Sequence, residues 1–185
     1  MTDSNLTKKA IAEVLMELCE HKRFDKLKIA DLTSACGLNR QTFYYHFNDI
    51  YALLAWAYED QSLKFLREGV TLDNWDRRVL QMLDKMEEKK AFYHNTVSAD
   101  QKVLSDCFFE VTNQLFLELF HRIDPDGKVS AQDCEFYARF FTYGCTGVLI
   151  NWIRGGLREP ADVVEKQLVR LAKDTEFFAG KLDHF

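Results

Sequence analysis

Proline is scarce in this chain of 185 residues, where it occurs only as Pro125 and Pro160. A proline inside a helix removes a backbone hydrogen bond and clashes with the preceding turn, so its scarcity permits long helices. Leucine, phenylalanine, glutamate, lysine and alanine are abundant, and this mixture favours helix over strand. The composition therefore predicts an all-α fold.

Long apolar runs and paired cysteines are also missing. No run of about 18 apolar residues occurs, and the first nine residues lack the apolar stretch of a signal peptide. We therefore expect a cytoplasmic protein that does not enter a membrane. No Cys-x-x-Cys pair is present, so we expect free and mostly buried thiols rather than disulfides. The cysteines are Cys19, Cys36, Cys107, Cys134 and Cys145.

The motifs that usually mark catalysis or nucleotide binding are absent: Gly-x-Gly-x-x-Gly, a phosphate loop, His-Glu-x-x-His and Gly-x-Ser-x-Gly. Asp124, Asp126 and Glu135 loosely resemble a calcium loop, but Val129 stands where that loop requires glycine. His46 lies between two aromatic residues, and we expect a packing or capping role for it. The sequence predicts no enzyme, no metal site and no cofactor.

A general excess of positive charge is missing too, because the chain carries 24 Lys and Arg against 29 Asp and Glu. Any contact with nucleic acid must therefore come from a local patch. The first 47 residues hold seven basic and six acidic residues, a net charge of +1, whereas the remainder carries −6. An acidic body behind a near-neutral N-terminal segment disfavours indiscriminate binding to phosphate.

Three short helices are predicted near the N-terminus. The apolar spacing that marks one helix face is carried by Ile11, Val14, Leu15 and Leu18. It predicts a first helix from about Thr7 to His21. A second helix over 29–36 is closed by Gly37, which readily takes the left-handed conformation. Asn39 is typical of an N-cap for a third helix through His46. Two helices joined by such a tight turn indicate a helix-turn-helix unit.

Longer helices are predicted for the remainder. One begins at about Asp49 and ends at the segment 69–74. Further helices are expected over 75–89, 102–123, 131–155 and 160–178.

The third helix would present one unusual polar face. If Phe43 and Phe47 point inward, the helical repeat places Arg40, Gln41, Tyr44 and Tyr45 on the opposite side. Arginine can pair with guanine and glutamine with adenine in the major groove, while hydroxyl groups reach phosphates. For an arbitrary helix a solvated polar face is the better interpretation, but the preceding turn favours DNA binding.

Residues 31–47, Asp-Leu-Thr-Ser-Ala-Cys-Gly-Leu-Asn-Arg-Gln-Thr-Phe-Tyr-Tyr-His-Phe, resemble the signature of the TetR family of transcriptional regulators. The similarity combines the turn glycine, the apolar residue after it, a polar cap and the Thr-Phe-Tyr-x-x-Phe ending, and covers about the first 65 residues. The stretch 147–160 is similar to the last two helices of the branch that contains the dihydroxyacetone kinase regulator.

This resemblance implies Arg40, Gln41 and Tyr44 as base readers, with Thr42 and Tyr45 as phosphate contacts. Two departures matter. Lys28 replaces a Ser or Thr that caps the second helix in many members, so that cap is lost, although the ammonium can still reach the DNA backbone. Ile50 replaces a lysine that contacts phosphate. The expected DNA-binding residues are Lys28, Asn39, Arg40, Gln41, Thr42, Tyr44 and Tyr45.

The resemblance also implies two domains, a DNA-binding domain at 1–48 and an effector-sensing and dimerisation domain at 49–185. A homodimer would form through the last two helices as a four-helix interface. Each of these helices carries an apolar stripe, and ordinary intrachain packing explains the first stripe equally well. The stripes are Tyr137, Phe140, Phe141, Gly144, Cys145, Val148, Leu149 and Trp152, then Val164, Leu168, Leu171 and Ala172.

A cavity for a small organic effector is implied among the middle helices. The residues expected to line it are Trp56, Phe92, Tyr93, Phe109, Asn113, Phe116 and Tyr143. The predicted function is a transcriptional regulator that binds a near-palindromic operator in double-stranded DNA as a dimer, modulated by a small ligand or a partner. An all-helical protein-interaction module is the alternative hypothesis, and an enzyme has the least support.

Overall fold

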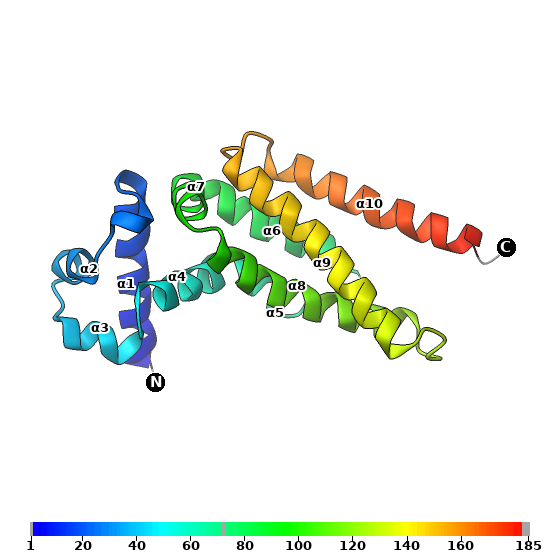
Figure 1. Ribbon diagram of the computed structural model, residues 1–185, viewed down its shortest axis with the longest axis horizontal. Helices are drawn as coiled ribbons and strands as arrows, with labels where there is room; N and C mark the ends of the chain where they lie inside the picture. The colour runs from blue at the N-terminus through cyan, green and yellow to red at the C-terminus, as the bar shows by residue number, and fades with distance from the viewer. Residues whose placement is uncertain (1, 72, 183–185) are drawn as a thin grey trace.

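The computed structural model describes residues 2–71 and 73–182, and every regular element within these ranges is a helix. This confirms the predicted all-α fold. The molecule is elongated, with α1, α2 and α3 at one end and the longer helices α8, α9 and α10 extending toward the other (Figure 1).

The N-terminal end consists of α1 (Thr2–His21), a 3₁₀ turn (Phe24–Lys26), α2 (Ile29–Cys36) and α3 (Arg40–His46). The bounds of α2 and α3 agree with the prediction. Helix α1 begins at Thr2 rather than Thr7, because its polar first turn continues the helix without contributing to the apolar spacing used to predict it.

The predicted fourth helix is a rod of three pieces: α4 (Ile50–Tyr58), a π-helical turn (Glu59–Leu63) and α5 (Lys64–Arg67). The Asp49 side chain caps it, since its Oδ1 accepts a 2.7 Å hydrogen bond from the backbone N–H of Ala52. Helix α4 packs against both α1 and α8, so it joins the N-terminal unit to the remainder.

Five further helices complete the described chain. Four of them lie where the sequence predicts helices, with ends shifted by a few residues, whereas α7 was not predicted. Its buried side includes the polar Thr96 between apolar neighbours, so hydrophobic spacing does not reveal it. The bounds are α6 Trp75–Glu88, α7 Lys90–Ala99, α8 Lys102–Ile123, α9 Ala131–Arg154 and α10 Ala161–Leu182.

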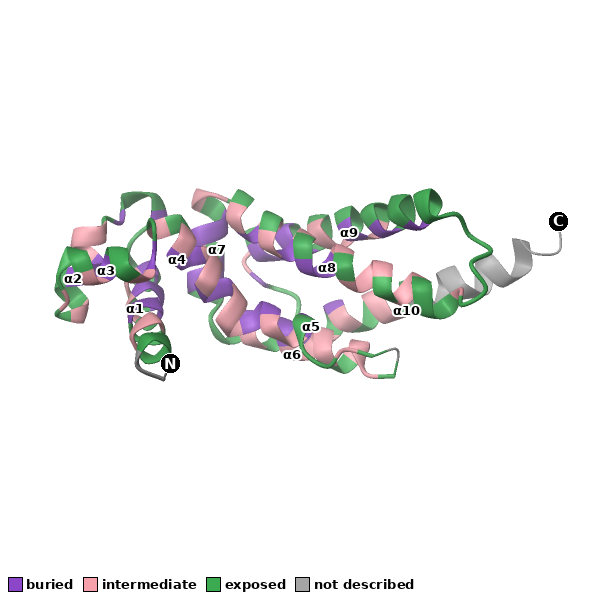
Figure 2. Ribbon diagram, turned by 90° about the horizontal axis from the view of Figure 1, so that it is seen from below, coloured by how far each residue is buried: buried purple, intermediate pink, exposed green. Residues whose placement is uncertain are grey.

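An aromatic part of the core joins α4 to α7, both of which carry buried residues in Figure 2. Two tyrosine rings stack there, Tyr58 and Tyr93, with centroids 5.6 Å apart. The Tyr58 hydroxyl donates to Thr96 Oγ1 at 2.7 Å, and the Tyr93 hydroxyl donates to Ser62 Oγ at 2.8 Å. Burial raises the pKa of both phenols, so they stay neutral hydrogen-bond donors.

Tyr93→Phe should lower the free energy of unfolding by about 1 kcal/mol, because it removes one buried hydrogen bond and keeps the ring. Denaturant unfolding followed by circular dichroism measures this. Tyr51→Phe is the matched control, since Tyr51 is 48% exposed and its variant should differ from the wild type by less than about 0.5 kcal/mol. Equal stability of Tyr93→Phe and the wild type would show that the Tyr93 hydroxyl contributes nothing.

Candidate nucleic-acid interface

The turn between α2 and α3 is built around Gly37. Its φ of 64° lies in the left-handed region, where glycine has no steric penalty. The backbone N–H of Leu38 donates to the carbonyl of Thr33 at 2.9 Å, and that of Gly37 donates to Ser34 at 3.3 Å. The turn therefore closes α2 and redirects the chain into α3, as the sequence predicted.

Asn39 starts α3. Its Oδ1 accepts hydrogen bonds from the Thr42 backbone N–H at 2.7 Å and from the Thr42 hydroxyl at 3.0 Å. This confirms Asn39 as the predicted N-cap. The same contact holds the Thr42 hydroxyl at the first turn of the helix, while the Nδ2 group of Asn39 remains available to an outside acceptor.

Two aromatic side chains anchor α3 on its inner side. Phe43 is fully buried and Phe47 is 5% exposed. Their rings contact each other at 5.9 Å between centroids, and the Lys8 ammonium lies 5.6 Å from the Phe47 ring. Because α3 is short, these contacts fix its rotation about its own axis.

The opposite side of α3 faces solvent, in agreement with the predicted polar face. Tyr44 and Tyr45 are 55% and 82% exposed, which is unusual for such large rings. Arg40 and Gln41 are exposed too, and no described residue forms an ion pair or hydrogen bond with their side chains. Lys28, Asn39, Arg40, Gln41, Tyr44 and Tyr45 are therefore all accessible from outside, and Thr42 is half-buried.

Lys28 precedes α2 and makes no cap with its side chain. The cap comes from Asp31, whose Oδ2 accepts from the Lys28 backbone N–H at 2.9 Å and from Lys22 Nζ at 2.7 Å. The hydrogen bond from Lys22 and that from the Lys28 backbone lower the pKa of Asp31 below its usual value. The sequence signal for this contact is an acid three residues after the cap position.

The remaining predictions for this unit concern His46 and Ile50. His46 is half-buried, with Nδ1 3.4 Å from Ser4 Oγ and its ring against Tyr45. Ile50 is half-buried and packs on the core. Ile50 therefore supplies no charged group for a phosphate, as the sequence predicted.

The geometry defines a class of protein. An anchored short helix that follows a tight turn and exposes arginine, glutamine and tyrosine side chains at one end of the molecule has the form of a helix-turn-helix recognition helix. The accessible donors and acceptors suit the major groove, and the hydroxyl groups suit phosphates.

The chain belongs to the TetR family. The family model described as "Bacterial regulatory proteins, tetR family" matches residues 11–56. A second, described as "Transcriptional regulator C-terminal region", matches residues 73–174 and so covers more than half of the chain. Both models describe transcriptional regulators, so the family assignment makes the protein a transcriptional regulator rather than an enzyme.

Known relatives agree with this assignment. The HTH-type dhaKLM operon transcriptional activator DhaS of Lactococcus lactis subsp. lactis (strain IL1403) is 25% identical over 101 residues, 55% of this chain and 54% of DhaS. The chain thus matches about half the length of this curated relative. The match also agrees with the branch indicated by residues 147–160.

Two solved structures share the fold. That of the dihydroxyacetone kinase operon activator DhaS has a TM-score of 0.71 at 19% identity, covering 91% of this chain and 95% of that one. A tetR-family transcriptional regulator from Streptomyces coelicolor has a TM-score of 0.55 at 18% identity, covering 91% and 78%. In the described part of the chain, no helix is both long and apolar enough to cross a membrane.

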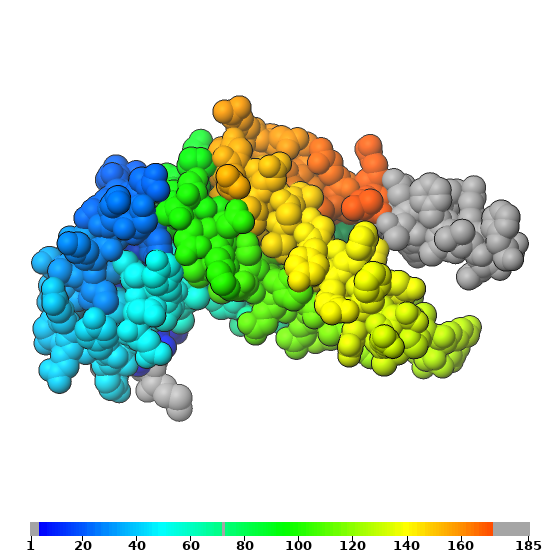
Figure 3. Space-filling view, in the orientation of Figure 1, coloured from blue at the N-terminus to red at the C-terminus, as the bar shows by residue number. Residues whose placement is uncertain are grey.

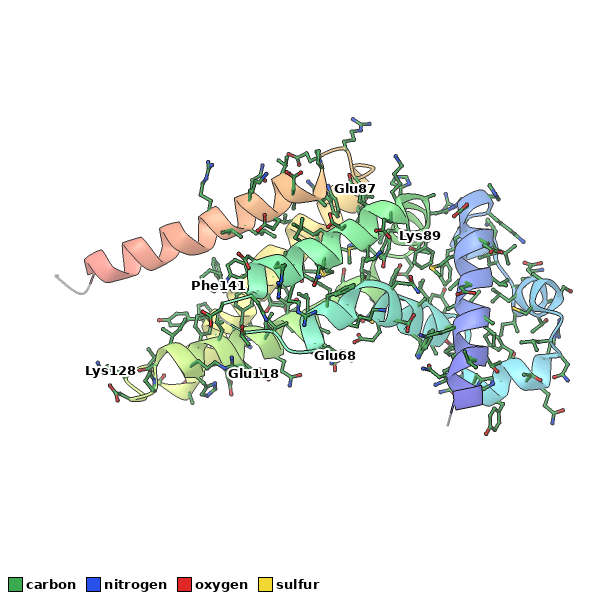
Figure 4. The ribbon with its side chains drawn as sticks, turned by 180° about the vertical axis from the view of Figure 1, so that it is seen from behind. Glu68, Glu87, Lys89, Glu118, Lys128 and Phe141 are labelled. Carbon is green, nitrogen blue, oxygen red and sulfur yellow. The ribbon has the colours of Figure 1, made fainter. Side chains whose placement is uncertain are left out.

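An open groove of about 430 Å³ lies between the end of α5 and α8. Its lining mixes apolar side chains with charged and polar ones, and Glu118 lies on the same side of the molecule as Glu68 (Figure 4). The lining residues are Leu66, Arg67, Gly69, Val70, Val111, Gln114, Leu115, Glu118 and Arg122.

The residues predicted to line an effector cavity lie elsewhere, in separate places. Trp56 packs against Phe47, with ring centroids 6.0 Å apart. Phe92 and Tyr93 belong to the dense core around Tyr58. The others lie where α8 packs on α9: Phe109 against Tyr143, Phe116 against Phe141, and Asn113, whose buried Oδ1 has no hydrogen-bond partner. This set remains a prediction, and none of its members lines the groove.

Arg40→Ala should cost about 1–3 kcal/mol of discrimination at one base pair of each half-site, because a bidentate contact with guanine would be lost. Binding to a panel of duplexes that differ at single positions measures it. Arg158→Ala removes an equal charge from an exposed loop far from α3 and should leave the base preference unchanged. An unaltered preference in Arg40→Ala would remove Arg40 from the base readers.

Proposed function

We propose that the protein acts in the cytoplasm as a homodimer that binds a near-palindromic operator, with one α3 in each of two successive major grooves. The observation that carries this proposal is the exposed, unpaired set of Arg40, Gln41, Tyr44 and Tyr45 on a helix whose rotation is fixed by Phe43. We assign base contacts to Arg40, Gln41 and Tyr44. Lys28, Asn39, Thr42 and Tyr45 are the proposed phosphate contacts.

Apolar exposure on α9 supports the dimer. This helix runs along the face of the body turned to the viewer in Figure 3. Phe136, Phe140 and Tyr143 follow one another at helical spacing, and their side chains are 56%, 65% and 66% exposed. Such aromatic exposure on one helix is typical of a surface that packs against another chain. A second copy of α9 is the partner we propose.

Some residues of the predicted stripe on α9 pack within the chain, and others are free to form an interface between protomers. Phe141 packs on Phe116 of α8, Leu149 belongs to the core and Cys145 packs against it, whereas Phe140 and Val148 are exposed. On α10, Val164 and Leu168 pack inside the chain and Leu171 is 58% exposed. Ala172 lies outside the residues whose side chains are described. We assign the exposed members to the proposed interface between protomers.

Modulation by a small ligand is supported by the groove beside α8. Its volume of about 430 Å³ lies within the range of small-molecule sites, and its apolar side chains beside Arg67, Glu118 and Arg122 offer contacts to a small polar organic effector. Helix α8 also packs against α4, which contacts α1. A ligand that binds two arrangements of these helices unequally would shift the position of α3. A partner protein bound at the same surface would act in the same way.

Selection from a random duplex library at near-physiological salt tests the proposal. We expect an enriched near-palindrome whose affinity falls steeply with salt, because phosphate contacts release counterions. A folded protein that enriches no sequence, alone or with the small-molecule fraction of a bacterial extract, would contradict the proposal and favour a protein-interaction module.

Phe140→Glu should weaken dimerisation at least tenfold, since a two-fold interface would bury the new charge twice. Sedimentation equilibrium over a range of concentrations measures the dissociation constant. Ile123→Glu is the matched control: it replaces an exposed apolar residue, 62% accessible, at the end of α8. Dimerisation of Phe140→Glu as strong as that of the wild type would place the interface elsewhere.

A further inference from the structure

Helix α7 joins the two domains that we propose, the head at 1–48 and the body at 49–185. It packs against α1 and the 3₁₀ turn of the head on one side and against α9 of the body on another. Its buried residues Phe92, Tyr93 and Val97 fasten it to the body core. Any movement of the head relative to the body must therefore change the contact between α1 and α7.

One side chain of α7 reaches the end of α1. The Asn95 amide donates a hydrogen bond to the carbonyl oxygen of Cys19 at 2.6 Å and a second to that of Lys22 at 3.2 Å. Helix α1 ends at His21, and the last carbonyl oxygens of a helix have no N–H donor within that helix. Asn95 supplies partners for two carbonyls at once, because its amide nitrogen carries two hydrogens.

A second polar contact between head and body that involves α1 is weaker. Lys9 Nζ lies 4.0 Å from Asp60 Oδ1, and the Lys9 side chain is 48% exposed. Exposed ion pairs of this kind do little to fix the relative orientation of two helices, because solvent screens the charges and the long side chains stay mobile. The two hydrogen bonds of Asn95, in contrast, are directional. Their acceptors are backbone atoms on either side of the last residue of α1, in Cys19 and Lys22.

We propose that Asn95 is a positioning residue for operator recognition: it fixes the angle between head and body and thereby the separation of the two α3 helices in the dimer. This inference rests on the proposed function, since only a dimer reads the spacing between half-sites. The chemistry required at this position is a neutral group with two donor hydrogens. A carboxylate of the same shape offers none, and it would be repelled by the negative end of α1.

The test compares full-length wild type with Asn95→Asp on operators whose half-sites are one base pair closer, at the selected spacing, or one base pair farther apart. We expect the variant to lose about tenfold in affinity at the selected spacing and less than threefold at the others. Its base preference within a half-site should not change. Ser98→Asp adds the same charge to an exposed position of α7 and should retain the wild-type spacing preference.

Hydrogen exchange gives a second readout that needs no DNA. Amides of residues 19–27 should exchange at least threefold faster in Asn95→Asp than in wild type, and at the wild-type rate in Ser98→Asp. Wild-type spacing preference in Asn95→Asp, or wild-type exchange at 19–27, would overturn the proposal. If the wild type selects no DNA, the proposed function fails by itself, and exchange alone decides whether Asn95 holds the head.

Discussion

The burial of Phe43 is the constraint on which the DNA-reading surface depends. Helix α3 spans only Arg40–His46, and a helix of that length is not stable alone in water. Its conformation is imposed by the Phe43 ring in the head core, by the left-handed Gly37 before it and by the Asn39 cap. Once Phe43 points inward, the helical repeat places Gln41 and Tyr45 on the outer side of α3, and Tyr44 and the first-turn residue Arg40 are exposed as well.

The connection between head and body likewise depends on a few helix contacts. Helix α4 contacts both α1 and α8, and α7 contacts both α1 and α9. The head is thus held at two places by elements whose other sides belong to the body core. Under the proposed function, a change in the packing of α8 near the groove would reach α3 through these contacts, and its size would be limited by the unequal affinity of the effector for the two arrangements.

The head could be predicted closely because its signals are local. Gly37, Asn39 and the spacing of Phe43 and Phe47 each act within a few residues, and the structure places all four as the sequence indicates. The α2 cap was harder, because Lys28 suggests a lost cap while Asp31 supplies one from the other direction.

The body was predicted less well because its contacts are distant in sequence. Helix α7 escaped prediction since Thr96 replaces an apolar residue on its buried side, where its hydroxyl donates to the carbonyl of Phe92 at 2.8 Å. The contact of Asn95 with Cys19 joins residues 76 positions apart, so no local sequence pattern predicts it. The groove is likewise formed by segments far apart in the sequence, whereas the predicted effector residues were mostly aromatic residues of the middle helices, where the family resemblance implies a cavity.

The most direct test of the central claim is to observe the side chains of α3 while DNA is added. The Nε–H signal of Arg40 and the side-chain amide signals of Gln41 can be followed by nuclear magnetic resonance during titration with an operator duplex. If α3 reads bases, these signals shift and saturate with the operator, and a scrambled duplex of equal length leaves them nearer their free positions. Operator binding without any change in these signals would contradict the account.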